Sequence, residues 1–196
     1  MNKTLKLACI AMMTALSIVA NFCTIQLNQN NAISFTITIC FIAGIYLGVL
    51  PAAVIGYCGD LIAHIILPLG PYNWFIALAT TLFGVICALI YKLPLKSKLA
   101  KLILALLACF TVCSCALNTF GLWLQYVIKE EAGLLGLVRF IKMDKSGITK
   151  TFWAYLGVRA PFALLNVVVN GVIVGVLQQT TVLDRLFKAL YQRDQK

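Results

Sequence analysis

The sequence predicts an all-α integral membrane protein with six transmembrane helices and both termini in the cytoplasm. Of its 196 residues, 62% are hydrophobic and only 11% are charged, whereas an average soluble domain is about half apolar and about a quarter charged. The apolar residues form long runs, and a membrane-spanning helix needs roughly 20 such residues. Because several later runs match the first in length, we interpret the first as a retained helix rather than a signal peptide.

The apolar runs set the limits of the expected helices. The second and third are short and are separated only by a turn before Pro51, a residue that suits the first turn of a helix because its missing N–H would be unpaired there. These two could equally form one helical hairpin. We expect a single membrane domain over residues 1–196 and an extracellular loop over 128–151. The six expected helices cover residues 5–27, 33–47, 50–67, 72–93, 99–127 and 152–180.

The distribution of charge gives the orientation. The formal net charge is +10, but the basic residues flank the apolar runs and form no stripe interleaved with aromatic residues, so we expect no nucleic-acid partner. Basic residues instead favour the cytoplasmic side of a membrane. The eight cysteines lie mostly within apolar runs, which is typical of packing residues rather than of disulfides. The expected cytoplasmic basic residues are Lys3, Lys6, Lys92, Lys96, Lys98, Lys101, Arg185, Lys188, Arg193 and Lys196.

Polar residues within the apolar runs are the strongest indication of a site. A charged group at the centre of a membrane helix costs about 2.5–3.5 kcal/mol, so such groups face a cavity or a partner rather than lipid. Their spacings of four and seven residues place them on common helix faces near the outer ends. They are Asp60 and His64 in the third expected helix, Asn118 and Gln125 in the fifth, and Arg159, Asn166 and Asn170 in the sixth.

Less specific interpretations stay open for these residues. Each asparagine could bond between helices, Arg159 could extend to the outer surface, and Asp60 with His64 could be a structural pair. No third metal ligand accompanies that pair, so we expect neither a metal nor a cofactor.

Two outer turns, "LNQNNAI" (Leu27 to Ile33) and "PLGPYNWF" (Pro68 to Phe75), suit ordered caps over a pocket. Tyr72, Trp74 and Trp123 could stack on a flat ring of a ligand there. They could equally be aromatic residues of the membrane interface.

Three segments carry a resemblance to a known family. They are "GDLIAHIILPLGPYNWFIALATTLFGVICAL" (Gly59 to Leu89), "ALNTFGLWL" (Ala116 to Leu124) and "ISFTITICFIAGIYLGVLPAAVIGYCGD" (Ile33 to Asp60). Together they resemble the substrate-binding S components of energy-coupling factor (ECF) vitamin transporters, and the second is similar to a segment of the folate-type branch.

The resemblance implies a high-affinity vitamin-binding subunit, not an enzyme, in a bacterial cell membrane. It implies that folate or a related pterin binds, with Arg159 holding a carboxylate, Asp60, Asn118 and Gln125 contacting ring nitrogens and amino groups, and Trp74 or Trp123 stacking on the ring. The implied partners are a transmembrane scaffold subunit and two cytoplasmic ATPases, besides membrane lipid. The family's Ala-x-x-x-Ala docking motif is matched by Ala11 and Ala15.

The resemblance leaves the substrate open. The family's Arg-x-x-Lys is matched by Arg159 with Phe162 in place of Lys, or alternatively by Arg139 and Lys142. Another heterocyclic vitamin or a nucleobase precursor is the alternative substrate. Outside transport, the alternatives are a membrane enzyme that uses Asp60 and His64, and a structural protein whose polar residues only join helices.

Overall fold

The computed structural model describes residues 3–28, 31–68, 72–128, 148–180 and 182–192. Most of the expected extracellular loop, together with Arg139 and Lys142, lies outside these residues. In chain order the elements are α1 (Lys3–Phe22), β1 (Ile25–Asn28), β2 (Asn31–Ile33), α2 (Thr36–Tyr46), α3 (Val49–Ile66), α4 (Trp74–Tyr91), α5 (Lys98–Ala108), the π-helix η1 (Cys109–Asn118), α6 (Thr119–Ile128), α8 (Ile148–Gln179) and α9 (Val182–Gln192).

Among the described residues, five helical stretches are long and apolar enough to cross a membrane. They are Lys3–Phe22, Val49–Ile66, Trp74–Tyr91, Lys98–Gln125 and Phe152–Gln179. The expected helical membrane protein is therefore confirmed. The second expected helix is present as α2, but its 11 residues rise only about 16 Å, roughly half of the hydrocarbon thickness.

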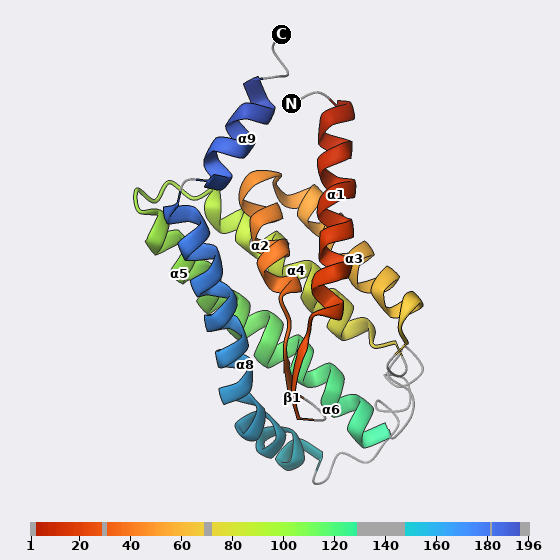
Figure 1. The fold of residues 1–196 in the computed structure, drawn as a ribbon. Helices are drawn as coiled ribbons and strands as arrows, with labels where there is room; N and C mark the ends of the chain where they lie inside the picture. The colour runs from red at the N-terminus through yellow and green to blue at the C-terminus, as the bar shows by residue number, and fades with distance from the viewer. Residues whose placement is uncertain (1–2, 29–30, 69–71, 129–147, 181, 193–196) are drawn as a thin grey trace.

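The largest departure from the predicted elements is a β-hairpin between α1 and α2. The first helix ends at Phe22, not at residue 27, and the next begins at Thr36 rather than at residue 33. Between them β1 pairs with β2 in antiparallel fashion, with Ile25 opposite Ile33. The pairing gives backbone groups partners beyond the end of the helix, and the hairpin projects toward α6 and away from α9 (Figure 1).

Helix α2 forms the centre of the bundle. All residues from Thr36 to Gly44 are buried, and α1, α3, α4 and α8 all contact the helix. The fully buried Phe41 packs edge-on against Phe83, with ring centroids 6.1 Å apart. All eight cysteines are free thiols. Cys87 donates to the carbonyl of Phe41 at 3.8 Å, so this thiol packs in the core like a small apolar residue.

Helices α2 and α4 approach so closely that glycine is needed at their contact. A Cβ added at Gly44 of α2 would collide with the backbone oxygen of Gly84 of α4, and one added at Gly84 would lie 3.0 Å from the backbone oxygen of Cys40 of α2. Small residues of this kind allow membrane helices to pack backbone against backbone. The contact fixes the distance between α2 and α4.

The fifth expected helix is interrupted by a π-helical segment. Ten residues, Cys109–Asn118, form η1 between α5 and α6. The hydroxyl of Thr119 donates to the carbonyl of Ser114, five residues earlier, at 2.8 Å. Because each π turn holds more residues than an α turn, the segment changes the direction in which later side chains point. Asn118 is its last residue.

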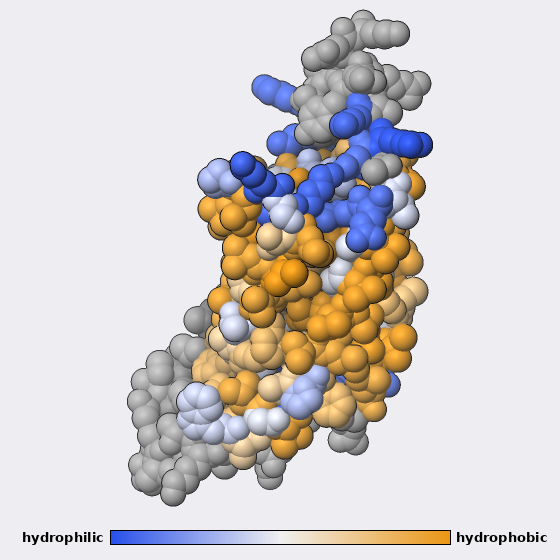
Figure 2. All heavy atoms as spheres, turned by 90° about the vertical axis from the view of Figure 1, so that its left-hand side faces the viewer, coloured by the Kyte–Doolittle hydropathy of each residue, from blue (hydrophilic) through white to orange (hydrophobic). Residues whose placement is uncertain are grey.

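The end of the molecule that carries α9 is basic. Figure 2 shows hydrophilic side chains gathered there, above a broad apolar belt. Exposed residues at this end include Lys92, Lys96, Lys98 and Lys188. The start of α1 lies at the same end (Figure 1).

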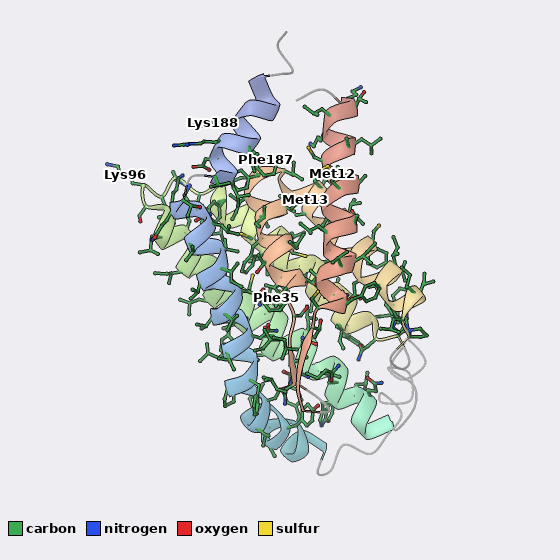
Figure 3. The ribbon with its side chains drawn as sticks, in the orientation of Figure 1. Met12, Met13, Phe35, Lys96, Phe187 and Lys188 are labelled. Atoms are coloured by element: carbon green, nitrogen blue, oxygen red, sulfur yellow. The ribbon has the colours of Figure 1, made fainter. Side chains whose placement is uncertain are left out.

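Helix α9, which the sequence analysis did not anticipate, is held to the bundle through two of its side chains, Phe187 and Asp184. Phe187 stacks on Tyr46, with ring centroids 4.5 Å apart, and Asp184 accepts hydrogen bonds from Tyr46 and Lys98, each at 2.7 Å. The bond from Lys98 holds the pKa of Asp184 below its usual value. Phe187 points toward the bundle and Lys188 points away from it (Figure 3).

The close contact between α2 and α4 leads to a prediction on stability. We expect Gly44→Ala to destabilise the purified protein by about 1–3 kcal/mol, because the added methyl group overpacks the helix contact. Thermal unfolding in detergent measures this. Gly157→Ala is the control, since a Cβ at Gly157 meets nothing within 4 Å. Equal melting temperatures for the two variants would contradict the assigned role of Gly44.

Candidate functional site

A cavity of about 670 Å³ lies at the end of the molecule opposite α9. We call it the site cavity. Its size falls within the range of roughly 300–1,000 Å³ that is typical of small-molecule sites. Seven of the ten predicted site residues line it, from α3, the turn before α4, η1, α6 and α8: Asp60, His64, Tyr72, Asn118, Gln125, Arg159 and Asn166.

One wall of the site cavity is built around a carboxylate. Asp60 of α3 accepts a long hydrogen bond from the side-chain amide of Asn21, 3.5 Å away, and His64 lies one turn further along the same helix. The ring of His64 lies 5.0 Å from that of Tyr72. Burial raises the pKa of the Tyr72 hydroxyl, and Asp60 raises it further. The hydroxyl therefore keeps its proton at neutral pH and can donate a hydrogen bond.

Another wall carries the guanidinium of Arg159. This residue is only 9% exposed, and its Nη1 donates to the backbone oxygen of Asn118 at 3.4 Å, with Tyr155 also beside it. Within the described residues, Nε of Arg159 and Oδ1 of Asn118 are buried without a hydrogen-bond partner. Leaving such groups unpaired costs about 1–3 kcal/mol each, more for a charged group. The wall is thus set up to bind an added polar molecule.

The chain between the hairpin and α2 is fixed to α8 by two asparagines. Asn166 accepts a hydrogen bond from the backbone N–H of Ser34 at 3.1 Å. Asn170, one turn later, accepts from the backbone N–H and the hydroxyl of Thr38, at 3.1 and 2.7 Å. Its own amide nitrogen donates to the backbone oxygen of Asn166 at 2.8 Å. These bonds hold one end of the site cavity in place.

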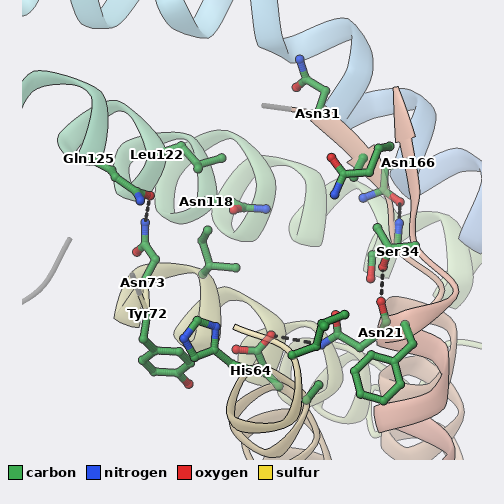
Figure 4. A pocket seen from close by; sticks show the side chains of 18 of the residues that line it. Asn21, Asn31, Ser34, His64, Tyr72, Asn73, Asn118, Leu122, Gln125 and Asn166 are labelled. Carbon is green, nitrogen blue, oxygen red and sulfur yellow. Dashed lines mark hydrogen bonds between the residues drawn. The ribbon is translucent and has the colours of Figure 1, made fainter. Parts of the chain in front are cut away.

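The beginning of α4 is fixed to α6 in a similar way. Asn73 caps α4 by accepting from the N–H of Phe75 at 3.1 Å, and its amide nitrogen donates to Gln125 at 3.4 Å. Figure 4 shows Asn118 and Gln125 along one edge of the hollow and His64 and Tyr72 along another. Polar groups from separate helices therefore surround a shared space.

Three predicted site residues do not line the site cavity. Trp74 is 50% exposed and packs edge-on against Tyr72. Trp123 is buried in an aromatic cluster, 5.8 Å from Phe120 between ring centroids, and Asn170 is wholly buried beneath the lining.

Sequence analysis missed several polar residues of the lining. They come from the end of α1, the hairpin and the α4 cap: Asn21, Thr24, Gln26, Asn31, Ser34 and Asn73. The two turns predicted as caps contain Asn31 and Asn73. The others could have been found only by recognising that the first helix ends at Phe22.

No cluster of three or more metal-binding side chains occurs in the part of the chain that the structure describes. Asp60 and His64 form only a pair. The site cavity instead carries one carboxylate, one guanidinium and several amides, which can together bind a polar molecule with both hydrogen-bond donors and acceptors.

Comparison with known proteins assigns the family. The family model for the substrate-specific component of ECF transporters matches residues 5–178. The protein belongs to this family. ECF substrate-specific components are substrate-binding transporter subunits and not enzymes, so the alternative of a membrane enzyme is set aside.

A solved structure shares the fold of this substrate-specific component. It is the crystal structure of FolT bound with folic acid, with a TM-score of 0.57 and 17% sequence identity, covering 87% of this chain and 93% of that chain. A comparison with curated protein sequences gives no match.

Proposed function

We propose that this substrate-specific component binds folate or a related pterin at the outer face of a bacterial cell membrane and delivers it to an ATP-driven ECF module. The observation that carries the proposal is the site cavity, where Asp60 and the incompletely bonded Arg159 face the same space. The shared fold with folic-acid-bound FolT supports it.

The chemistry of folate matches the two kinds of wall. The pterin ring presents adjacent N–H donors, which suit the carboxylate of Asp60, with Asn118 and Gln125 as amide partners. The glutamate part of folate carries carboxylates, and a guanidinium can hold one of them with two parallel hydrogen bonds. Arg159 would contribute its unpaired Nε to this contact, beside a second N–H of the same guanidinium. Of the three aromatic residues expected to stack on a ring, only Tyr72 lines the site cavity, and His64 would offer a second ring beside the heterocycle.

The affinity follows from the unpaired groups. A ligand that completes the hydrogen bonds of Arg159 and Asn118 removes a penalty that the empty protein carries. A similar ligand that lacks an acceptor for Arg159 or a donor for Asn118 leaves these groups unpaired and binds more weakly. The same groups therefore supply both affinity and selectivity.

We place the site cavity outside and the basic end inside, with both termini cytoplasmic and six helices in the membrane. Exposed lysines concentrate at the end that carries α9, which agrees with the preference of basic residues for the cytoplasm. In this orientation the substrate enters from outside the cell.

A second substrate class has one observation in its favour. Phe162 stands where folate-type members carry a lysine, and it lines a small cavity of about 40 Å³ beside Arg159 and Asn118. Another heterocyclic vitamin with a single acidic group would need no second cation there.

For the partner subunits we propose docking through α1. Only 11% of the residues in its most apolar stretch are buried inside the protein, the lowest share among the five candidate spans. Ala11 and Ala15 are exposed one turn apart, beside Met12, which is 73% exposed. Such small residues let a second helix approach closely. A scaffold subunit coupled to two ATPases would contact this face.

The first prediction from this function concerns the ligand. We expect Arg159→Gln to weaken folic acid binding by about 10- to 150-fold, since a hydrogen bond to a charged group contributes about 1.5–3 kcal/mol. Asp60→Asn should lose affinity to a similar degree. Isothermal titration calorimetry on purified protein measures both.

Arg185→Gln is the control for that titration, because it removes the same charge at the exposed far end. Unchanged affinity in a folded Arg159→Gln variant would exclude Arg159 from the binding site. Failure of folic acid to bind the unaltered protein, with another vitamin binding in its place, would favour the second substrate class.

The second prediction concerns assembly. Ala11→Trp or Ala15→Trp should abolish copurification with the scaffold subunit and leave ligand affinity unchanged, because a large side chain separates the helices. Val172→Trp, at an exposed position on α8, is the control and should assemble normally. Intact assembly of both alanine variants would place the docking surface elsewhere.

A further inference from the structure

A second cleft, separate from the site cavity, lies at the basic end of the molecule. Its volume is about 180 Å³, and it shares no lining residue with the site cavity. We call it the basic cleft. The polar residues that line it come from α2, α4, the connection to α5, α5 itself, α8 and α9: Tyr46, Tyr91, Lys96, Lys98, Lys101, Gln178 and Asp184.

The lining of the basic cleft carries excess positive charge. Three lysines and one aspartate give it a formal charge of +2 (3 − 1). Lys98 is paired with Asp184 at 2.7 Å. Lys101 donates to the backbone oxygen of Tyr91 at 3.0 Å, which is a neutral acceptor, and Lys96 is exposed. The lining therefore supplies no carboxylate for Lys96 or Lys101.

Hydrogen bonds between helices hold the walls of the cleft in position. Gln178 of α8 is buried and donates to the hydroxyl of Tyr91 of α4 at 2.8 Å. Tyr46 of α2 donates to Asp184 of α9 at 2.7 Å. Two pairs of helices, α4 with α8 and α2 with α9, are thus joined beside Lys96 and Lys101, so the cleft is a formed structure rather than a chance grouping of surface charges.

Exposed apolar side chains border the cleft. Leu95 lines it directly, and Leu93 and Leu99 are exposed on either side along the chain. On α9, Val182 and Leu186 are also exposed. Figure 2 shows the hydrophilic end of the molecule meeting the apolar belt at this level. A molecule bound here would contact lysines with one part and the membrane interior with another.

We propose that the basic cleft binds the headgroup phosphate of an anionic phospholipid from the cytoplasmic leaflet. Lys96 and Lys101 contact the phosphate, and the acyl chains lie against the leucines beside α5. Basic pockets between membrane helices on this side suit such headgroups. Free phosphate shares the charge but not the acyl chains, so the apolar border favours the lipid.

The test uses the purified full chain in detergent, titrated with phosphatidylglycerol or phosphatidylcholine and followed by native mass spectrometry. We expect preferential binding of phosphatidylglycerol. Lys96→Gln together with Lys101→Gln should weaken it roughly 30-fold, about fivefold for each lysine. Lys3→Gln with Lys6→Gln, an equal loss of exposed charge on α1, should change it less than twofold.

Three results would overturn the proposal: equal binding of the two lipids, equal weakening by the two double variants, and displacement of phosphatidylglycerol by millimolar inorganic phosphate. The third would identify the occupant as a free anion. Because Lys101 also bonds to Tyr91, the single variant Lys96→Gln serves as a second test that leaves this bond intact. It should weaken binding about fivefold, and unchanged binding in this variant would likewise contradict the proposal.

Discussion

The arrangement of the site depends on one wholly buried side chain, Asn170. Its amide accepts two hydrogen bonds from Thr38 and donates to the backbone of α8, which joins the first turn of the central helix α2 to α8. In an apolar interior, few other partners are available to these groups, so the register between the two helices is strongly fixed. Asn166 and Arg159 lie four and eleven residues earlier on α8. The register that satisfies Asn170 therefore also turns them toward the site cavity.

The molecule has three levels between its two ends. The site cavity with its amides, carboxylate and guanidinium occupies one end, and the glycine contacts and buried aromatic rings around α2 form a tightly packed middle. The lysines and α9 form the other end. Within the described residues, Nε of Arg159 and Oδ1 of Asn118 lie at the cavity end without hydrogen-bond partners.

The role of the polar residues inside apolar runs was predictable, because a polar group facing lipid costs free energy and therefore indicates a cavity or a polar partner. Asp60, Asn118 and Arg159 line a single cavity, whereas Asn170, on the same predicted stripe as Arg159, is buried outside it. The aromatic residues were less predictable, because a tryptophan is equally suited to packing, to the interface and to a ligand, and only tertiary contacts distinguish these. The hairpin was missed because Ile25 and Leu27 were assigned to the apolar first helix, although "TIQLN" alternates polar and apolar residues as a strand does. The π-helical segment η1 left no recognisable signal in the sequence.

An experimental structure of the protein with folic acid bound is the most direct measurement of the central claim, which is that one guest completes the hydrogen bonds of groups from several helices. The account predicts ligand density in the site cavity, with Nε of Arg159 and the amide of Asn118 both bonded to the ligand and Asn170 still joined to Thr38. Ligand density elsewhere, with Arg159 satisfied by protein atoms alone, would contradict it.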